Sequence, residues 1–195
     1  MSKLPPLAVL VSHTVSDFDA WKRAFDAHQP ARKAAGILGH HLNLGADGAV
    51  SVYLPALDRA QLAAFLESSD LKDAMKSGAV TSAPQIAWLK PIEDSHIADR
   101  ALAGMIIDHS VTSFAAWKKI YDSVGALRHD AGIVGAAVNQ SLDDANHVVV
   151  YHQAETEAAL QRFVASAELK AAMQAGGVTA PPQIRFVRSM PGAAY

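Results

Sequence analysis

Cysteine is absent from this sequence of 195 residues. Its absence excludes disulfide scaffolds, thiolate nucleophiles, and zinc or iron–sulfur sites with cysteine ligands. It is also typical of proteins in a reducing compartment. The chemistry of any functional site must therefore come from other side chains.

Charged residues are scarce and balanced, with 17 basic against 19 acidic residues and a formal net charge of −2. No basic stripe is present to neutralise phosphates, so we expect neither nucleic acid nor an anionic membrane surface as a partner. Long apolar runs are lacking too, since none approaches the ~18 residues that span a bilayer. The N-terminal apolar run is too short for a secretory signal. We therefore expect a soluble, cytoplasmic protein.

What the sequence does contain is a packed-core composition and a repeat. Half of the residues are apolar, which supports one large domain or two of about 100 residues. Residues 13–45 match residues 109–141 at 13 of 33 positions, and residues 52–89 match residues 150–187 at 17 of 38 positions. Two copies account for nearly the whole chain, which predicts a duplicated domain rather than a solenoid.

The expected division places the first unit at residues 1–92 and the second at residues 104–195. The segment between them, residues 93–103, has no counterpart before Leu7 and is rich in polar and charged residues. Those are the properties of a surface linker.

Each copy changes its hydrophobic period in the same order. A short apolar run predicts a buried first strand, and Phe18, Trp21 and Phe25 then share one face of a helix. Two strands follow, then a helical region broken near Ser68, where Asp70 is a suitable cap, and then a last strand. The order β-α-β-β-α-β is that of a ferredoxin-like unit with an antiparallel four-stranded sheet.

Two helices cover one face of such a sheet and leave the other bare. In the first strand Ala8 and Leu10 point to one face while Val9, Val11 and His13 point to the other, and both sets are largely apolar. Leaving one face in water would forgo on the order of 10 kcal/mol. We therefore predict an α+β fold in which two tandem ferredoxin-like units form an intramolecular, pseudo-dimeric α+β barrel. The alternative is docking of each unit on another chain, so we expect a monomer or a homodimer.

The repeated motifs resemble those of the dimeric α+β barrel superfamily, in particular antibiotic-biosynthesis-monooxygenase-like proteins. The motifs read HxVxxFxxWK, LKxAM, GxVT and PQI in both copies. The resemblance implies the barrel fold and a small apolar or aromatic ligand, because members include cofactor-free oxygenases of aromatic polyketides, muconolactone isomerases and haem-degrading enzymes. Trp21 and Asn43 do not map cleanly onto the residue set of the haem-degrading members, and we expect no cofactor.

His13 and His109 are the candidate catalytic residues. Each ends the first strand of its unit, a position that we expect near a mouth of the barrel. An imidazole there can act as a general base or hydrogen-bond a phenol or enolate. The structural alternative is that each histidine fixes the strand-to-helix turn. Trp21 and Trp117, on the apolar helix stripe, are interpreted as core residues.

Arg32 and Arg128 are candidate ligand-binding residues because an arginine recurs beside aromatic side chains. Such a guanidinium can bind a carboxylate or enolate oxygen. A salt bridge or the capping of helix carbonyls is the alternative.

The remaining candidates are polar residues on central strands. A mainly apolar cavity with a few convergent polar groups is the usual form of a ligand site, and satisfied polar groups at strand ends are the equal alternative. The candidates are Asn43, Tyr53, Asn139 and Tyr151.

A metal site is not expected. His40 and His41 are neighbours on a strand and point to opposite faces, and the second copy has Ala136 and Ala137 there. Because several histidines occur in one copy only, we hypothesise that one half keeps a working pocket while the other is mainly scaffold.

Three function classes stay open, since no phosphate loop or nucleophile elbow is present. The first is a cofactor-independent monooxygenase or isomerase acting on an aromatic or quinone-like compound. The second is a non-catalytic binder of such a ligand, and the third is a structural or assembly module whose interior packs shut. An interior without a cavity of about 300 Å3 would favour the third class.

Overall fold

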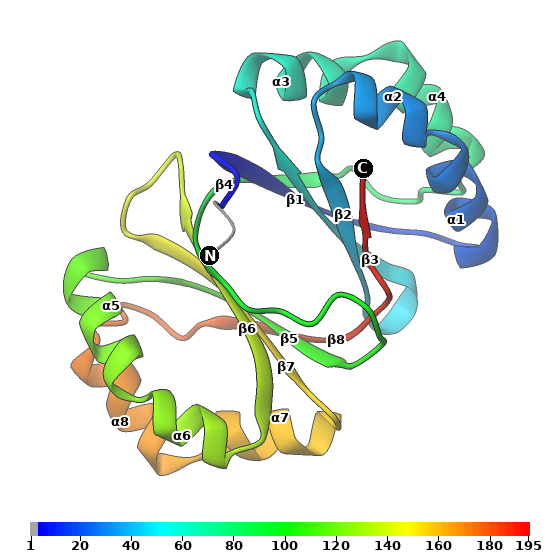
Figure 1. The fold of residues 1–195 in the computed structure, drawn as a ribbon. Coiled ribbons are helices and arrows are strands. Elements are labelled where there is room, and N and C mark those ends of the chain that lie inside the picture. Colours follow the sequence, from blue (N-terminus) through cyan, green and yellow to red (C-terminus); the bar gives the residue numbers. More distant parts are fainter. Residues whose placement is uncertain (1–3) are drawn as a thin grey trace.

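The computed structural model describes residues 4–195 as two similar α+β units (Figure 1). The first unit comprises β1 (Leu7–Thr14), α1 (Phe18–Ala27), α2 (Gln29–Ala34), β2 (Gly39–Leu44), the 3-10 turn η1 (Ala46–Gly48), β3 (Ala49–Ala56), α3 (Arg59–Glu67), α4 (Ser69–Ser77) and β4 (Gln85–Asp94). The second comprises β5 (Ala103–Ser110), α5 (Phe114–Ser123), α6 (Gly125–Asp130), β6 (Ile133–Ser141), β7 (His147–Ala154), α7 (Glu157–Ala165), α8 (Ala167–Ala175), β8 (Gln183–Ser189) and β9 (Ala193–Ala194).

Side-chain caps fix where the helices begin. Asp17 accepts a hydrogen bond from the Ala20 amide at the start of α1. The second helical region is broken as expected, but Ser68 caps α4 by accepting from the Leu71 amide, so Asp70 is not the cap. Ser68 is the better placed because a cap must precede the first helical residue with extended backbone angles.

Eight strands form one closed antiparallel barrel. Their order is β3-β1-β4-β6-β7-β5-β8-β2, and β2 pairs back onto β3. Two seams join the units, because β4 pairs with β6 and β8 pairs with β2. The predicted fold class is confirmed. The closure also pairs the edge strands of each sheet, which would otherwise present unpaired backbone groups.

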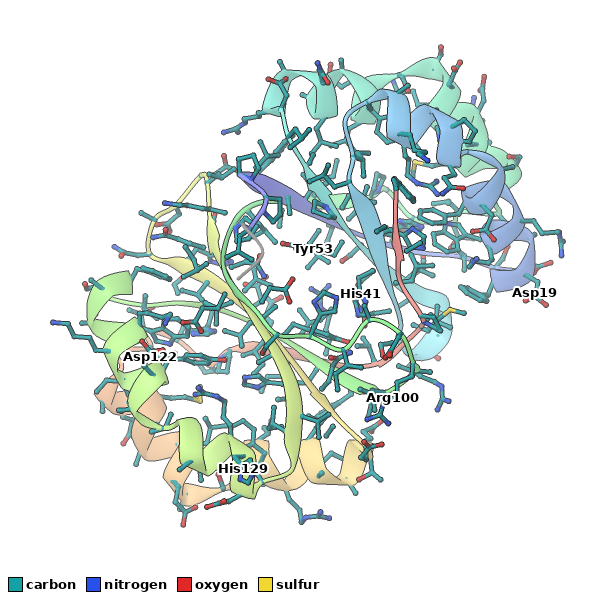
Figure 2. The ribbon with its side chains drawn as sticks, in the orientation of Figure 1. Asp19, His41, Tyr53, Arg100, Asp122 and His129 are labelled. Carbon is teal, nitrogen blue, oxygen red and sulfur yellow. The ribbon has the colours of Figure 1, made fainter. Side chains whose placement is uncertain are left out.

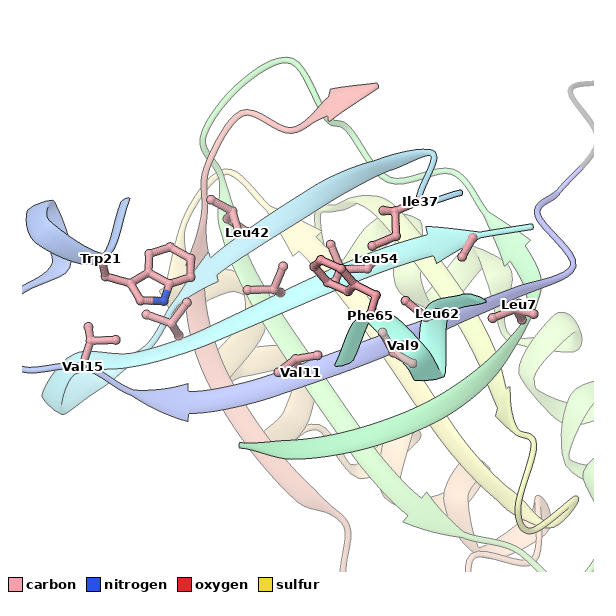
Figure 3. Packing of buried hydrophobic residues seen from close by; sticks show 13 residues of the cluster. Leu7, Val9, Val11, Val15, Trp21, Ile37, Leu42, Leu54, Leu62 and Phe65 are labelled. Carbon is pink, nitrogen blue, oxygen red and sulfur yellow. The ribbon is translucent and has the colours of Figure 1, made fainter. Parts of the chain in front are cut away.

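Apolar side chains gather in three clusters, because alternate strand residues point to opposite faces. Val9 and Val11 face the helices of the first unit and pack with Trp21 and Phe65 (Figure 3). An equivalent cluster lies under the helices of the second unit. The third fills the barrel, where Leu10 meets residues of both units.

The connection between the units runs from the end of β4 at Asp94 to the start of β5 at Ala103. The division of the chain at residues 92 and 104 stays a prediction. At the other end of the chain, β9 pairs with β2 of the first unit, so the second unit's last residues lie beside α2 (Figure 1). Within residues 4–195 no helix is both long enough and apolar enough to cross a membrane.

Candidate functional site

The four predicted tyrosine and asparagine residues meet inside the barrel, in the space where Figure 2 shows Tyr53 between the two halves. The Tyr53 hydroxyl donates to Asn139 Oδ1 at 3.0 Å, and the Tyr151 hydroxyl donates to Asn43 Oδ1 at 2.8 Å. Burial raises the pKa of both phenols, which keeps them protonated as donors. Each pair joins one unit to the other.

The cavity beside these pairs is small, at about 40 Å3. Ligand sites have volumes of about 300–1,000 Å3, whereas a cavity of this size holds on the order of one water molecule. The barrel interior is therefore packed, and the tyrosine–asparagine pairs satisfy one another instead of facing open space.

The large cavity lies between the sheet and the helices of the second unit. Its volume is about 770 Å3, and it is bounded by β5, β7, α5, α7 and α8. Apolar side chains make up most of its wall, among them Ile107, Val150, Phe163, Leu169 and Met173. Both its size and its lining are those of a small-molecule site.

His109 lies in the wall of the large cavity. The sequence had instead predicted a position near a barrel mouth. His109 shares the helix-facing side of β5 with Ile107, because the two residues are two positions apart. Its ring packs against Trp117 with 5.5 Å between centroids. Burial lowers the pKa of His109 to about 4, and Nδ1 is enclosed without a hydrogen-bond partner among residues 4–195. At neutral pH the side chain is an uncharged imidazole with unused hydrogen-bonding capacity.

Tyr121 and His152 form a second polar element of the same wall. The tyrosine hydroxyl lies 3.2 Å from His152 Nε2. Burial, followed by the charge of Arg128, lowers the pKa of His152 to about 3. Burial raises the pKa of Tyr121 to about 12. The neutral imidazole can therefore accept the phenol proton in a hydrogen bond, while its Nδ1 is enclosed without a partner among the described residues.

Arg128 supplies positive charge beside this pair. Its guanidinium carbon lies 3.8 Å from the centroid of the Tyr121 ring, and Nη1 donates to the Tyr121 carbonyl at 2.5 Å. Among residues 4–195 no carboxylate forms an ion pair with it. A cation held in place without a counter-ion is suited to an oxyanion on a ligand.

The first unit has a closed chamber at the matching position, with a volume of only about 70 Å3. His13 lies there against Trp21, at 5.7 Å between ring centroids. Both of its ring nitrogens are enclosed and have no hydrogen-bond partner in the part of the chain that the structure describes. Burial lowers the pKa of His13 as well. Arg32 is 2% exposed and lies over the Phe25 ring at 3.6 Å. The structure thus brings His109 and Arg128 to an open cavity and their partners His13 and Arg32 to a filled one.

Sequence reasoning did not single out Tyr121 and His152 as site residues. The available signal was the difference between the copies, since these positions hold Phe25 and Leu54 in the first unit. Both replacements exchange an apolar side chain for a polar one at a buried position. Within residues 4–195 no group of three or more histidine, aspartate or glutamate side chains is placed to hold a metal ion.

Comparison with a protein family supports the resemblance seen in the motifs. Residues 114–175 match the family model described as antibiotic biosynthesis monooxygenase. The matched region runs from the start of α5 to the end of α8 and includes Tyr121, Arg128 and His152. No curated protein matches the chain.

Solved structures share the fold over nearly the whole chain. An anthrone oxidase-like protein is 14% identical with a TM-score of 0.68, covering 96% of this chain and 92% of its own. A proposed monooxygenase from Lactobacillus acidophilus NCFM is 12% identical with a TM-score of 0.62, covering 98% and 99%. A ferredoxin-fold protein from Listeria monocytogenes 4b F2365, related to antibiotic biosynthesis monooxygenases, is 6% identical with a TM-score of 0.56, covering 94% of both chains. Identities this low establish the shared fold alone.

Proposed function

We propose that the second unit binds an aromatic or quinone-like compound in the large cavity and oxidises it with O2 as a cofactor-independent monooxygenase. The observation that carries the proposal is a cavity of about 770 Å3 with apolar walls, a neutral histidine, and an arginine that forms no ion pair with any carboxylate of residues 4–195. The matched family, and neighbours with names such as anthrone oxidase-like protein, favour the same chemistry.

Ligand binding follows from the walls of the cavity. Burying a flat aromatic molecule against Trp117, Phe163 and Leu169 is favourable at about 25 cal/mol per Å2 of apolar surface. Arg128 then donates a hydrogen bond to the ligand's carbonyl or phenol oxygen, and the Tyr121 oxygen, whose proton is directed at His152, accepts one from a ligand hydroxyl. These few polar groups orient the molecule, and the apolar walls exclude water from it.

Proton removal is the role proposed for His109. Its neutral imidazole accepts a proton from an acidic C–H or O–H of the ligand, and Arg128 stabilises the resulting enolate. The electron-rich enolate then reacts with O2: a ring CH2 becomes C=O with one oxygen atom, and the other leaves as water. Return of the proton to a different carbon, without O2, would make the same site an isomerase.

A non-catalytic ligand-binding protein is the second candidate. Burial lowers the pKa of His109 to about 4, and such a group is a weak base at neutral pH. The same imidazole is still a good hydrogen-bond partner for a phenol. The third class is a module whose sheets pack shut, and the space between the sheets is indeed small, at about 40 Å3. The large cavity lies outside that space, under the helices of the second unit, and its volume favours the two ligand-binding classes.

The test is oxygen uptake with anthrone and a panel of polycyclic phenols and hydroquinones, with ligand binding followed in parallel by fluorescence of the tryptophans. We expect uptake of one O2 per product, and His109→Ala should slow it by roughly 10²–10⁴-fold. His13→Ala is the matched control and should leave the rate unchanged. Saturable binding without uptake would establish the binder, and neither binding nor uptake across the panel would reject both proposals.

A further inference from the structure

Tyr195 places a phenol against Arg32 in the first unit. Arg32 Nε donates to the Tyr195 hydroxyl at 2.5 Å, and His40 Nδ1 lies 2.9 Å from the same oxygen. The Tyr195 amide donates to the Leu38 carbonyl, in continuation of the pairing between β9 and β2. The Tyr195 ring therefore lies on the side of Arg32 that faces β2, and its hydroxyl is hydrogen-bonded to both Arg32 and His40.

The second unit has an unfilled pocket at the matching position. We call it the side pocket; its volume is about 220 Å3, and it lies between α6 and β6. Its wall includes Tyr121, Arg128, Val134 and Ala136, which occupy the positions of Phe25, Arg32, Leu38 and His40 in the first unit. The first-unit residues of this set, or their neighbours, are the ones that contact Tyr195.

A local difference in the backbone path explains why the pocket is empty of protein side chains. The Ser95 amide donates to the Ala136 carbonyl. Ser95 therefore lies beside Ala136 as Ala193 lies beside His40, the counterpart of Ala136 in the first unit. Two residues after Ser95, the Ile97 backbone is bonded to a side chain: the Gln153 side chain accepts from the Ile97 amide at 2.7 Å and donates to the Ile97 carbonyl at 3.0 Å. In the first unit Pro55 stands at the position of Gln153 and has no side-chain amide to offer.

The side pocket is distinct from the large cavity. Tyr121 and Arg128 belong to the walls of both and separate them. Its volume is below that of drug-sized sites, so it accepts a single ring rather than a polycyclic molecule. Glu93 also contributes to its wall, paired with Lys118. A carboxylate in the wall disfavours an anionic ligand and favours a neutral hydroxyl, which both accepts and donates hydrogen bonds.

We propose that the side pocket is a second ligand site that binds a small neutral phenol, with its ring between α6 and β6 and its hydroxyl on Arg128. Tyr195 and Arg32 show the same arrangement within the first unit. The site goes beyond the proposed oxidation in the large cavity and does not require it.

The test uses p-cresol, which has the ring and hydroxyl of a tyrosine side chain, with calorimetry for stoichiometry and ¹H–¹⁵N NMR for location. The wild-type chain should bind one p-cresol with shifts in α6 and β6. Tyr195→Ala vacates the first unit's site and should raise the stoichiometry to two. Arg128→Met should weaken wild-type binding by about tenfold to 100-fold, because a charge-assisted hydrogen bond is lost. Toluene, which lacks the hydroxyl, is the matched control ligand and should bind at least tenfold more weakly.

Two filling variants separate the side pocket from the large cavity. Ala136→Trp should abolish p-cresol binding in the wild-type background, and it should leave the site created by Tyr195→Ala intact. Val164→Trp fills the large cavity and should leave p-cresol binding unchanged. The proposal is overturned if p-cresol fails to saturate the wild-type chain, if binding survives Ala136→Trp, or if it is lost only in Val164→Trp. Oxygen uptake with anthrone in Ala136→Trp shows independently whether the large cavity is functional.

Discussion

The two halves of this chain place the same histidine, tryptophan and arginine between a sheet and its helices, yet one chamber is closed and the other open. The volumes differ from about 70 Å3 in the first unit to about 770 Å3 in the second. His28 occupies space in the first unit with its ring 5.6 Å from that of Phe65, where the second unit has the smaller Val124. Repetition of a motif thus conserves a framework without conserving the space inside it.

The second difference is the polarity of the chamber walls. Leu54 in the first unit is replaced by His152 in the second, and Phe25 by Tyr121. Enclosed nitrogens without a hydrogen-bond partner among residues 4–195 occur in both chambers, on His13, His28 and Arg32 of the first and on His109 and His152 of the second, so they do not distinguish the halves. What distinguishes them is that Tyr121 and His152 line an open volume. The comparison supports the hypothesis that the second half is the working half and the first half mainly scaffold, which the following experiments test.

The largest effect should come from filling matched positions with tryptophan. Val164→Trp places a large ring in the open cavity and should reduce anthrone oxidation or binding by more than about 100-fold at little cost in stability. Leu66→Trp, its counterpart, has no such space and should destabilise the fold by about 1–3 kcal/mol through overpacking, with the activity unchanged. Urea unfolding and oxygen uptake on the same two proteins check the pair. Equal effects of both variants would remove the distinction between open and closed chambers.

Acid should destabilise the protein through its buried histidines. The pKa of His109 is about 4 in the folded protein against 6.5 for the ordinary side chain, so between these values only the unfolded chain binds the proton. Stability is therefore full above pH 6.5 and falls as the pH drops towards 4, by about 3 kcal/mol for this group.

His109→Leu is expected to make the loss of stability between pH 7 and pH 4 correspondingly smaller, as measured by urea unfolding at several pH values. An unchanged slope in His109→Leu would show that this imidazole is charged in the folded protein or already open to water.

Exchanging the residues that differ between the chambers should have opposite effects on stability. His152→Leu combined with Tyr121→Phe restores the residue pair of the first unit and removes both the enclosed nitrogen without a partner and the phenol bonded to the same ring. This double variant should stabilise the protein by about 1–3 kcal/mol at neutral pH, while weakening ligand binding. Leu54→His introduces such a group and should destabilise it by a similar amount. Thermal unfolding of both variants measures the change, and a stabilising effect of Leu54→His would contradict the account of the closed chamber.

The smallest effects are expected where the halves are alike, inside the barrel. Tyr53→Phe removes one hydrogen bond between the units, and Tyr151→Phe removes two, to Asn43 and His41. Each variant leaves an asparagine oxygen unsatisfied. Each should cost about 1–2 kcal/mol, with no change in ligand binding. Urea unfolding and anthrone titration test both points, and a marked loss of binding would place the ligand in the barrel instead.

Part of the site was open to prediction from sequence, because recurrence marked His109 and Arg128. The predicted position of His109 near a barrel mouth was wrong. The alternation of side chains along a strand shows that His109 shares a face with Ile107, but it does not show which face the helices cover. The tyrosine and asparagine residues on the central strands do lie close together, inside the barrel. Their mutual hydrogen bonds and the small volume beside them depend on how closely the two units approach.

The sequence by itself determined the architecture, because a twofold repeat with apolar residues on both strand faces must cover both faces to be stable. Only the tertiary structure decided which chamber stays open and where Tyr195 lies. Those outcomes depend on a few side-chain volumes and on contacts between residues distant in sequence, such as Arg32 with Tyr195 and Gln153 with Ile97. Strand and helix periodicity specifies the face of a residue, whereas the free volume beside it is set by every neighbour at once.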